Sequence, residues 1–272
     1  MKGSILVLGR GFIGKRVSQG LGCAISERKI FTLKDAEDEI KKKKPKILIN
    51  CAGHIGGNVD DCELDKDNAL FANAFLPLIL AEAALRNKVK LIHISTGCIY
   101  HFDYKKDRPI AENKAPDFLD LFYSRSKIYA ERALEALSKQ FNILIARIRI
   151  PLDYIPDKRN ILTKLLSYKQ VNNLPNSVTY LPDFINALKH LIKIDARGIY
   201  NMVNKGALKY KDMLDIYAKY SPGFNYEIVD FKKLNMRRTN LILSTKKLED
   251  AGFNVRDIHE VLKECVKKYI KY

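Results

Sequence analysis

Short apolar runs of strand length alternate with longer amphipathic stretches through the first half of the chain. The runs, several of them rich in Ile and Leu, predict buried strands at residues 4–8, 46–51, 89–95 and 142–148. Between them, apolar residues recur at helical spacing over residues 13–21, 67–86 and 122–139. Strand, helix and strand in this order favour right-handed crossovers and a parallel sheet. The pattern predicts an α/β fold with a Rossmann-type, doubly wound parallel sheet.

The second half of the chain is less regular. Four prolines interrupt the region after the last predicted strand, at positions 151, 156, 175 and 182. Helical patterns return at residues 183–194, 211–220 and 257–270. We predict that residues 1–150 bind a dinucleotide and that residues 151–272 form mainly a smaller C-terminal lobe over the substrate, with some segments returning to the main sheet.

Composition narrows the class of protein. With 47% hydrophobic and 29% charged residues the chain can bury a core, which excludes global disorder. No run approaches the ~20 consecutive apolar residues of a membrane span, so a soluble, cytoplasmic protein without a membrane partner is expected. The five cysteines are scattered and odd in number, which predicts reduced thiols and no metal site.

The formal net charge of +17 raises the question of nucleic-acid binding. The lysines are spread along the chain, and the one dense run, residues 41–44, closes an acidic helical pattern just before Pro45. Cations at that place complement a helix dipole, so a solvated helix end is the better interpretation and no nucleic-acid partner is expected. A basic surface still attracts anionic small molecules.

A glycine-rich turn follows the first predicted strand and opens the first predicted helix. It has the G-x-G-x-x-G form, and its residues are Gly9, Arg10, Gly11, Phe12, Ile13 and Gly14. In this context the glycines allow a tight turn and a close approach of backbone to a pyrophosphate, and the helix N-terminus favours anionic charge. Dinucleotide binding is therefore predicted, and a purely structural glycine turn is the alternative.

Two arginines bear on which dinucleotide is bound. No acidic residue after the second strand can be placed cleanly as a ribose ligand, whereas Arg10 and Arg28 could neutralise a 2′-phosphate. This pattern favours NADPH over NADH. The alternative is that both are ordinary surface arginines.

Tyr123 and Lys127 are four residues apart at the start of a predicted helix. This spacing puts both on one helix face, where the ammonium can lower the pKa of the phenol toward the range of a general acid. Tyr-x-x-x-Lys is also common by chance, so the pair alone does not decide the function.

The order of the motifs changes the interpretation. The glycine turn, Asn50-Cys51-Ala52-Gly53, Ser95-Thr96-Gly97-Cys98-Ile99-Tyr100 and the Tyr123/Lys127 pair together resemble the extended short-chain dehydrogenase/reductase family. The resemblance covers nearly the whole chain. It implies that Thr96, Tyr123 and Lys127 form the catalytic set. It also implies that Cys51, Ala52 and Gly53 line the cofactor.

Further segments narrow the resemblance. Residues 58–63 and 237–248 look like two segments that mark dTDP-4-dehydrorhamnose reductases. Residues 96–99, 147–151, 159–164, 174–179 and 198–201 resemble the bifunctional 3,5-epimerase/4-reductases that make nucleotide-linked L-rhamnose in plants and some large viruses.

The narrower resemblance implies a second set of roles. Cys98 would act as the epimerisation base and Lys164 as its acid partner, because a C4 ketone acidifies the protons at C3 and C5. A buried structural thiol is the alternative for Cys98. The implied contacts to the substrate are Cys98, Arg149, Asn160, Lys164, Asn176 and Arg237. For Asn160 and Asn176, surface loop positions are an equal alternative.

The expected function is therefore NADPH-dependent 3,5-epimerisation and 4-reduction of a nucleotide-4-keto-6-deoxy-D-glucose, giving a nucleotide-L-rhamnose. The alternatives are a 4-reductase without epimerase activity, an enzyme like GDP-L-fucose synthase, and a non-catalytic NADP-binding subunit. The nucleotide sugar is the expected partner. A functional link to a nucleotide-glucose 4,6-dehydratase and a homodimer are further expectations.

Overall fold

A computed structural model describes residues 5–234 and 237–272. The chain forms two compact units, each built from three segments. Unit 1 comprises Met1–Ile99, Pro116–Arg147 and Leu188–Tyr200, and unit 2 comprises Tyr100–Ala115, Ile148–Ala187 and Asn201–Tyr272. Ser4, the first residue of the first predicted strand, lies outside the described residues.

Unit 1 is organised around a sheet with the strand order β2-β1-β3-β4-β5-β9. The strands are β1 (Ile5–Leu8), β2 (Ala24–Ile25), β3 (Ile47–Asn50), β4 (Lys90–Thr96), β5 (Ile143–Ile148) and β9 (Gly198–Asn201). Strand β1 pairs in parallel with β2 and β3, and β3 with β4. The strand order reverses between β1 and β3, which makes the carboxyl ends of these two strands the expected place for a ligand.

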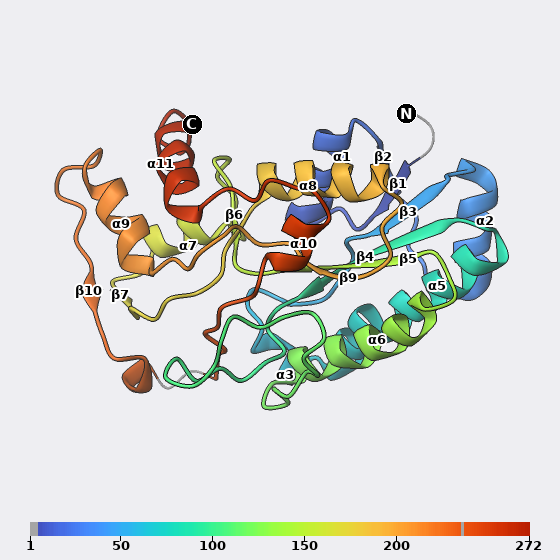
Figure 1. Ribbon diagram of the computed structural model, residues 1–272, viewed down its shortest axis with the longest axis horizontal. Coiled ribbons are helices and arrows are strands. Elements are labelled where there is room, and N and C mark those ends of the chain that lie inside the picture. Colours follow the sequence, from blue (N-terminus) through green and yellow to red (C-terminus); the bar gives the residue numbers. More distant parts are fainter. Residues whose placement is uncertain (1–4, 235–236) are drawn as a thin grey trace. The chain divides into compact units, whose positions relative to one another are not determined.

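Helices cover both faces of this sheet (Figure 1), which confirms the predicted doubly wound fold. Helix α1 (Phe12–Leu21) lies on one face, and α5 (Leu76–Arg86) and α6 (Phe122–Ser138) lie on the other. Helix α2 (Leu33–Lys43) packs beside α5. The core of the unit joins apolar side chains of strands and helices, among them Leu48, Leu91, Ile145, Leu80 and Leu134.

The predicted helix over residues 67–86 is present but is not α-helical throughout. After the short α3 (Asp61–Leu64) it runs as α4 (Lys66–Leu70), a π-helical turn η1 (Phe71–Phe75) and α5. Pro77, in the first turn of α5, has no N–H to donate to the carbonyl of Asn73, which accounts for the break in the α-helical pattern. Lys66–Arg86 is long and apolar enough to cross a membrane by length and composition alone; half of its most apolar window is buried inside the protein, as in core helices.

Unit 2 contains mainly helices and two short parallel strand pairs, β6–β8 and β7–β10. Its elements are β6 (Pro151–Leu152), α7 (Ile161–Leu166), β7 (Gln170–Val171), β8 (Thr179–Tyr180), α9 (Tyr210–Ala218), β10 (Glu227–Ile228), η2 (Phe231–Leu234), α10 (Lys246–Asp250) and α11 (Ile258–Tyr269). Leu162, Leu214 and Leu262 belong to its buried core. Helix α8 (Leu181–Lys193) runs from unit 2 into unit 1.

Candidate active site

The glycine turn after β1 is in direct contact with the loop after β3. Gly9 has a φ of +95°, and a Cβ on it would lie 2.5 Å from the backbone nitrogen of Ala52. A Cβ on Gly14 would lie 1.8 Å from the carbonyl oxygen of Gly9. Both positions therefore require glycine, as predicted for a turn that lets the backbone approach a pyrophosphate closely. The turn lies at the point where the strand order reverses.

The two arginines predicted near a 2′-phosphate have different surroundings. The guanidinium of Arg28 lies 2.9 Å from a carboxylate oxygen of Asp35 and 3.5 Å from one of Asp38. The hydrogen bond from Arg28 is the main reason why the pKa of Asp35 lies well below its usual range. Arg10 contacts Glu27 only loosely, at 3.8 Å, and its side chain is 58% exposed. Arg10 is thus the more available cation of the two.

Tyr123 and Lys127 lie one turn apart at the start of α6, and both are largely buried, with exposed fractions of 8% and 5%. Thr96 ends β4 at the carboxyl edge of the sheet and is also buried. Its hydroxyl accepts a hydrogen bond of 3.1 Å from the backbone N–H of Cys98. The three residues implied to be catalytic thus all belong to unit 1.

Lys127 is a buried cation whose pKa is lowered to about 8, chiefly because burial removes water from the ammonium, while the charges of Cys62 and Glu131 act in the opposite direction. Among residues 5–234 and 237–272 its ammonium has no hydrogen-bond or ion-pair partner. A Cβ on Gly53 would lie only 3.2 Å from Nζ. An unpaired buried ammonium beside a glycine loop fits a polar ligand such as the hydroxyl groups of a dinucleotide.

The Cys98 side chain is half-buried and packs against the apolar cluster formed by Cys62, Ala69 and Tyr123. The hydroxyl of Ser124 donates a hydrogen bond of 2.6 Å to the carbonyl oxygen of Cys98. The cysteine is therefore carried on a loop that is tied to the helix of the phenol. The thiol is not fully buried.

A buried ion pair fixes α6 to the sheet, and no motif in the sequence pointed to it. Glu131, four residues after Lys127, accepts hydrogen bonds from Nε and Nη2 of Arg147 on β5, at 3.0 and 2.6 Å. The hydroxyl of Ser95 on β4 donates to its other oxygen at 2.5 Å. Both charged side chains are only 1% exposed. The spacing of Glu131 from Lys127 was the available signal, since residues four apart share a helix face.

Polar side chains around the β3 loop are also buried and connected. Asn50 accepts from the backbone N–H of Ala52 at 3.0 Å, which leaves its amide nitrogen to donate to Nδ1 of His93 at 3.2 Å. Burial holds the pKa of His93 well below its usual value, so the ring is neutral. His93 is fully buried in β4, and its Nε2 has no partner among the described residues. Asn73 bonds both backbone groups of His54 at 2.9 Å.

Three of the predicted substrate residues in unit 2 are buried and hydrogen-bonded within the protein. Asn160 caps α7 by accepting from the N–H of Leu162 at 3.2 Å. Asn176 accepts from the guanidinium of Arg149 at 3.0 Å. Neither asparagine is a surface loop residue, because both are 0% exposed. Their observed hydrogen bonds stabilise the structure of unit 2.

Lys164 and Arg237, the other two predicted substrate residues, are more accessible. Lys164 lies on α7, and its pKa is lowered first by burial and then by the charges of Arg159 and Arg238. A lowered pKa makes an ammonium a better proton donor. Arg237 is exposed. Lys164 belongs to unit 2 and Cys98 to unit 1.

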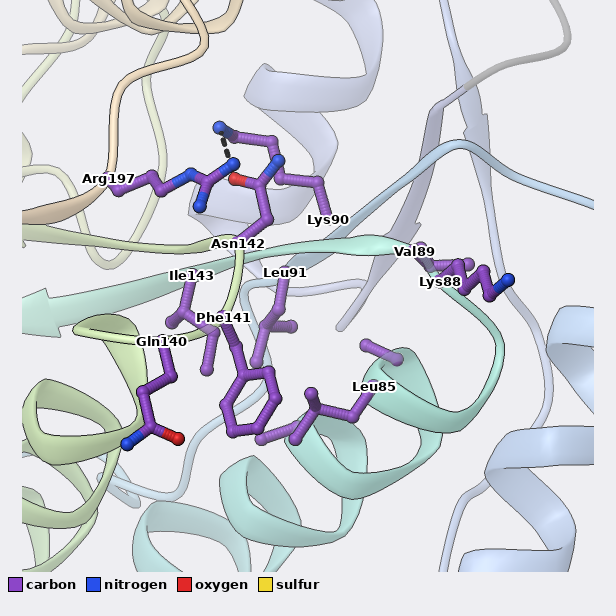
Figure 2. A pocket seen from close by; sticks show the side chains of 12 residues that line it. Leu85, Lys88, Val89, Lys90, Leu91, Gln140, Phe141, Asn142, Ile143 and Arg197 are labelled. Atoms are coloured by element: carbon purple, nitrogen blue, oxygen red, sulfur yellow. Dashed lines mark hydrogen bonds between the residues drawn. The ribbon is translucent and has the colours of Figure 1, made fainter.

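A cavity of about 350 Å³ lies at the opposite, amino end of β4 and β5. Figure 2 shows Leu85, Leu91 and Phe141 among its walls, with Lys90 and Asn142 at one side. The ammonium of Lys90 donates to Asn142, Asp195 and the carbonyl of Ala196 at 2.8, 2.7 and 2.7 Å. All three of its donors are used, so this cation closes the end of the sheet and is not available to a ligand.

A glycine turn at the strand-order reversal, together with a buried tyrosine and lysine one helical turn apart, defines a dinucleotide-binding α/β protein of the short-chain dehydrogenase/reductase type. The profile of the RmlD substrate binding domain matches residues 7–270. The chain belongs to this family.

Two curated relatives come from Arabidopsis thaliana. A bifunctional dTDP-4-dehydrorhamnose 3,5-epimerase/dTDP-4-dehydrorhamnose reductase is 30% identical over 80% of this chain and 74% of its own length. A trifunctional UDP-glucose 4,6-dehydratase/UDP-4-keto-6-deoxy-D-glucose 3,5-epimerase/UDP-4-keto-L-rhamnose-reductase is 30% identical over 79% of this chain. The chain spans 33% of the length of that trifunctional relative.

Solved structures have the same fold. The L780 UDP-rhamnose synthase from Acanthamoeba polyphaga mimivirus superimposes with a TM-score of 0.92 and 24% identity, over 98% of this chain and 100% of that one. A dTDP-4-dehydrorhamnose reductase from Bacillus anthracis str. Ames, solved in complex with NADP, has a TM-score of 0.84 and 19% identity, over 100% of this chain and 99% of that one.

Proposed function

We propose that this protein converts a nucleotide-4-keto-6-deoxy-D-glucose to a nucleotide-L-rhamnose by 3,5-epimerisation and NADPH-dependent 4-reduction. The observation that carries the proposal is the position of Cys98. Its loop is bonded to the helix that bears Tyr123 and Lys127, and its side chain packs against the cluster that contains the phenol. A reductase needs the tyrosine and the lysine, whereas only an epimerase needs a base beside them.

The proposed cofactor site consists of the glycine turn and the end of β3. Gly9, Gly11 and Gly14 let the backbone approach the pyrophosphate, and the first backbone amides of α1 face it. Lys127 binds ribose hydroxyls, which would satisfy its unpaired ammonium, and Arg10 is the cation for a 2′-phosphate. Bound NADPH supplies the hydride for C4. The NADP complex of the Bacillus anthracis reductase, which has the same fold, supports this assignment.

In the reduction, Tyr123 donates its phenolic proton to the C4 oxygen, on which negative charge develops. Lys127 lowers the cost of forming the phenolate, because its ammonium lies one turn away on the same helix face. Thr96 donates a hydrogen bond to the same oxygen and so holds the ketone in place. Burial of all three residues strengthens these interactions by excluding water.

In the epimerisation, the Cys98 thiolate removes the proton from C3 or C5, and the electron pair moves into an enolate whose oxygen is the C4 ketone oxygen. Lys164 returns a proton to the opposite face of the same carbon, which inverts its configuration. The lowered pKa of Lys164 supports the role of donor. Proton transfer from the Cys98 thiol to the neutral Lys164 amine through solvent then restores the thiolate and the ammonium.

The test is turnover of UDP-, dTDP- and GDP-linked 4-keto-6-deoxyglucose with NADPH, with the product's stereochemistry determined by NMR. Oxidation of NADPH and an L-rhamno product are expected with one or more donors. If no donor consumes NADPH, the proposal is wrong. If reduction requires a substrate that is already epimerised, the protein is a reductase alone.

Cys98→Ala separates the two half-reactions. In heavy water this variant should lose deuterium incorporation at C3 and C5 but still reduce a pre-epimerised 4-keto-L-rhamnose sugar. Cys23→Ala is the matched control, since Cys23 is a second half-buried thiol. Normal exchange in Cys98→Ala would assign the base to another residue.

The 4-keto sugar implies a nucleotide-glucose 4,6-dehydratase that supplies it, and we propose that functional link together with a cytoplasmic location. The trifunctional Arabidopsis relative, whose name includes such a dehydratase activity, supports the link.

We also propose a homodimer. Phe75 on η1 and Tyr129 on α6 are each 52% exposed on neighbouring helices, which favours burial by a second copy. Light scattering of the wild type and of Tyr129→Lys tests the homodimer.

A further inference from the structure

The helix that carries Tyr123 and Lys127 begins without a cap of its own. Leu121 stands at the N-cap position of α6 and makes no side-chain hydrogen bond to the helix. The first backbone N–H groups of a helix have no partners within it, and an uncapped end frays. Tyr123 is the second residue of α6, so its position depends on this first turn being formed.

The acceptor comes from a distant part of the sequence. A carboxylate oxygen of Glu63, on α3, accepts a hydrogen bond of 2.7 Å from the backbone N–H of Phe122. A carboxylate at a helix N-terminus also matches the helix dipole. Glu63 thus supplies from outside the helix the interaction that an N-cap residue normally provides.

Two residues close to Glu63, Cys62 and Lys66, contact the same turn of α6. Cys62 is fully buried in the cluster with Tyr123, and its thiol donates to the carbonyl of His54 at 3.4 Å. The ammonium of Lys66 lies 5.9 Å from the centre of the Phe122 ring. Asp61 folds the preceding loop by accepting from the N–H of Gly57 at 2.7 Å.

These contacts give a role to residues 58–63, the segment that resembles dTDP-4-dehydrorhamnose reductases but supplies none of the catalytic residues proposed above. We propose that Glu63 is a positioning residue: it caps α6 through the Phe122 amide and so holds the phenol of Tyr123 at the reacting carbonyl. The proposal rests on the proposed function only in so far as Tyr123 is the acid.

Three variants test the role. Glu63→Ala removes the acceptor, Glu63→Gln keeps an oxygen acceptor without the charge, and Glu135→Ala is a control on the far half of α6. We expect Glu63→Ala to lower kcat by about 10- to 100-fold with little change in KM for NADPH or sugar, since misplacement of one catalytic group costs about this much. Glu63→Gln should recover most of kcat.

Hydrogen exchange measures the cap without turnover. In Glu63→Ala the backbone amides of residues 122–126 should exchange faster than in the wild type, and in Glu63→Gln they should exchange at nearly the wild-type rate. Unchanged exchange and kcat in Glu63→Ala would overturn the proposal, as would failure of Glu63→Gln to restore either. If the wild-type protein reduces no keto sugar, the proposed function fails, while the exchange result still decides whether Glu63 caps α6.

Discussion

The hydroxyl of Ser124 donates a 2.6 Å hydrogen bond to the backbone carbonyl of Cys98. Ser124 directly follows Tyr123 on α6, so this bond joins the loop of the proposed base to the helix of the proposed acid. Ser124 is fully buried, and water cannot replace its hydroxyl.

Ser124→Ala should therefore lower the free energy of unfolding by about 1–2 kcal/mol, because the carbonyl of Cys98 loses a buried partner. It should also slow deuterium incorporation at C3 and C5 more than it slows reduction. Urea unfolding and NMR measure the two effects. Ser138→Ala is the control, since the Ser138 hydroxyl bonds the carbonyl of Glu135 within the last turns of α6. Equal losses of stability and of deuterium incorporation in both variants would show that the Ser124 bond does not position the Cys98 loop.

Removal of Glu131 should destabilise unit 1 strongly. Glu131→Ala leaves the guanidinium of Arg147 buried without its partner, a change that costs about 3–5 kcal/mol. Glu135→Ala removes a carboxylate one turn further along, where the contact to Arg132 is long and exposed, and should change stability by less than about 0.5 kcal/mol. Urea unfolding followed by circular dichroism compares the two. Similar midpoints would show that the buried pair does not hold α6 to the sheet.

The fold could be read from the sequence because its signals are local. Each predicted strand follows from a short apolar run and each predicted helix from the spacing of apolar residues along one segment, and the observed bounds differ by at most two residues for α8, α9 and α11. The glycine turn was equally local. The π-helical turn before Pro77 was not predicted, since periodicity does not distinguish it from an α-helix.

The supporting contacts of the site could not be predicted in the same way. Glu63 bonds an amide 59 positions later, and Glu131 bonds Arg147 on another element. Such pairs are brought together by the tertiary fold, and a single sequence contains no pattern for them. The same holds for Asn176, whose side chain bonds Arg149 and Asn240 inside unit 2.

A substitution at Gly9 tests whether the glycine turn binds the cofactor. In Gly9→Ala the new Cβ would lie 2.5 Å from the Ala52 nitrogen, in a backbone conformation with φ of +95°. We expect loss of NADPH binding by more than about 100-fold, because the turn must shift away from the β3 loop. Gly22→Ala is the control: φ is +59° there, but no atom lies within 4 Å of the new Cβ. Calorimetric titration with NADPH should show near-normal affinity in this control. Equal affinity in both variants would show that the close approach of Gly9 to the β3 loop is not needed for NADPH binding.

Arg10 and Arg28 should differ in their effect on cofactor choice. Arg28 is already paired with Asp35 and Asp38, whereas Arg10 is largely exposed. We expect Arg10→Ala to raise KM for NADPH by about tenfold with little effect on KM for NADH, as loss of a phosphate contact predicts. Arg28→Ala should change the ratio of KM for NADPH to KM for NADH by less than about threefold, because it removes no phosphate contact. Initial rates with both cofactors measure it; a larger effect in Arg28→Ala would place the 2′-phosphate at that residue.

The lowered pKa of Lys127 predicts a pH dependence of stability in the protein without bound cofactor. The pKa is about 8 in the folded protein and near 10.5 in the unfolded chain, so below pH 8 both states carry the charge and folding bears the full cost of its burial. Between these values the unfolded chain binds more protons, and the free energy of unfolding rises with pH. The difference between the two pKa values of Lys127 corresponds to a rise of about 3 kcal/mol in the free energy of unfolding.

Lys127→Met isolates that contribution, because methionine fills similar space without a charge. The thiol of Cys62, whose pKa burial raises to about 11, acts in the opposite direction above pH 9, and subtracting the two urea-unfolding series cancels it. The variant should be the more stable protein below pH 8, and the difference should shrink as the pH rises toward 10.5. A difference independent of pH would mean that the ammonium is paired or hydrated in solution, and Lys127 would then not be the unpaired cation that a dinucleotide satisfies.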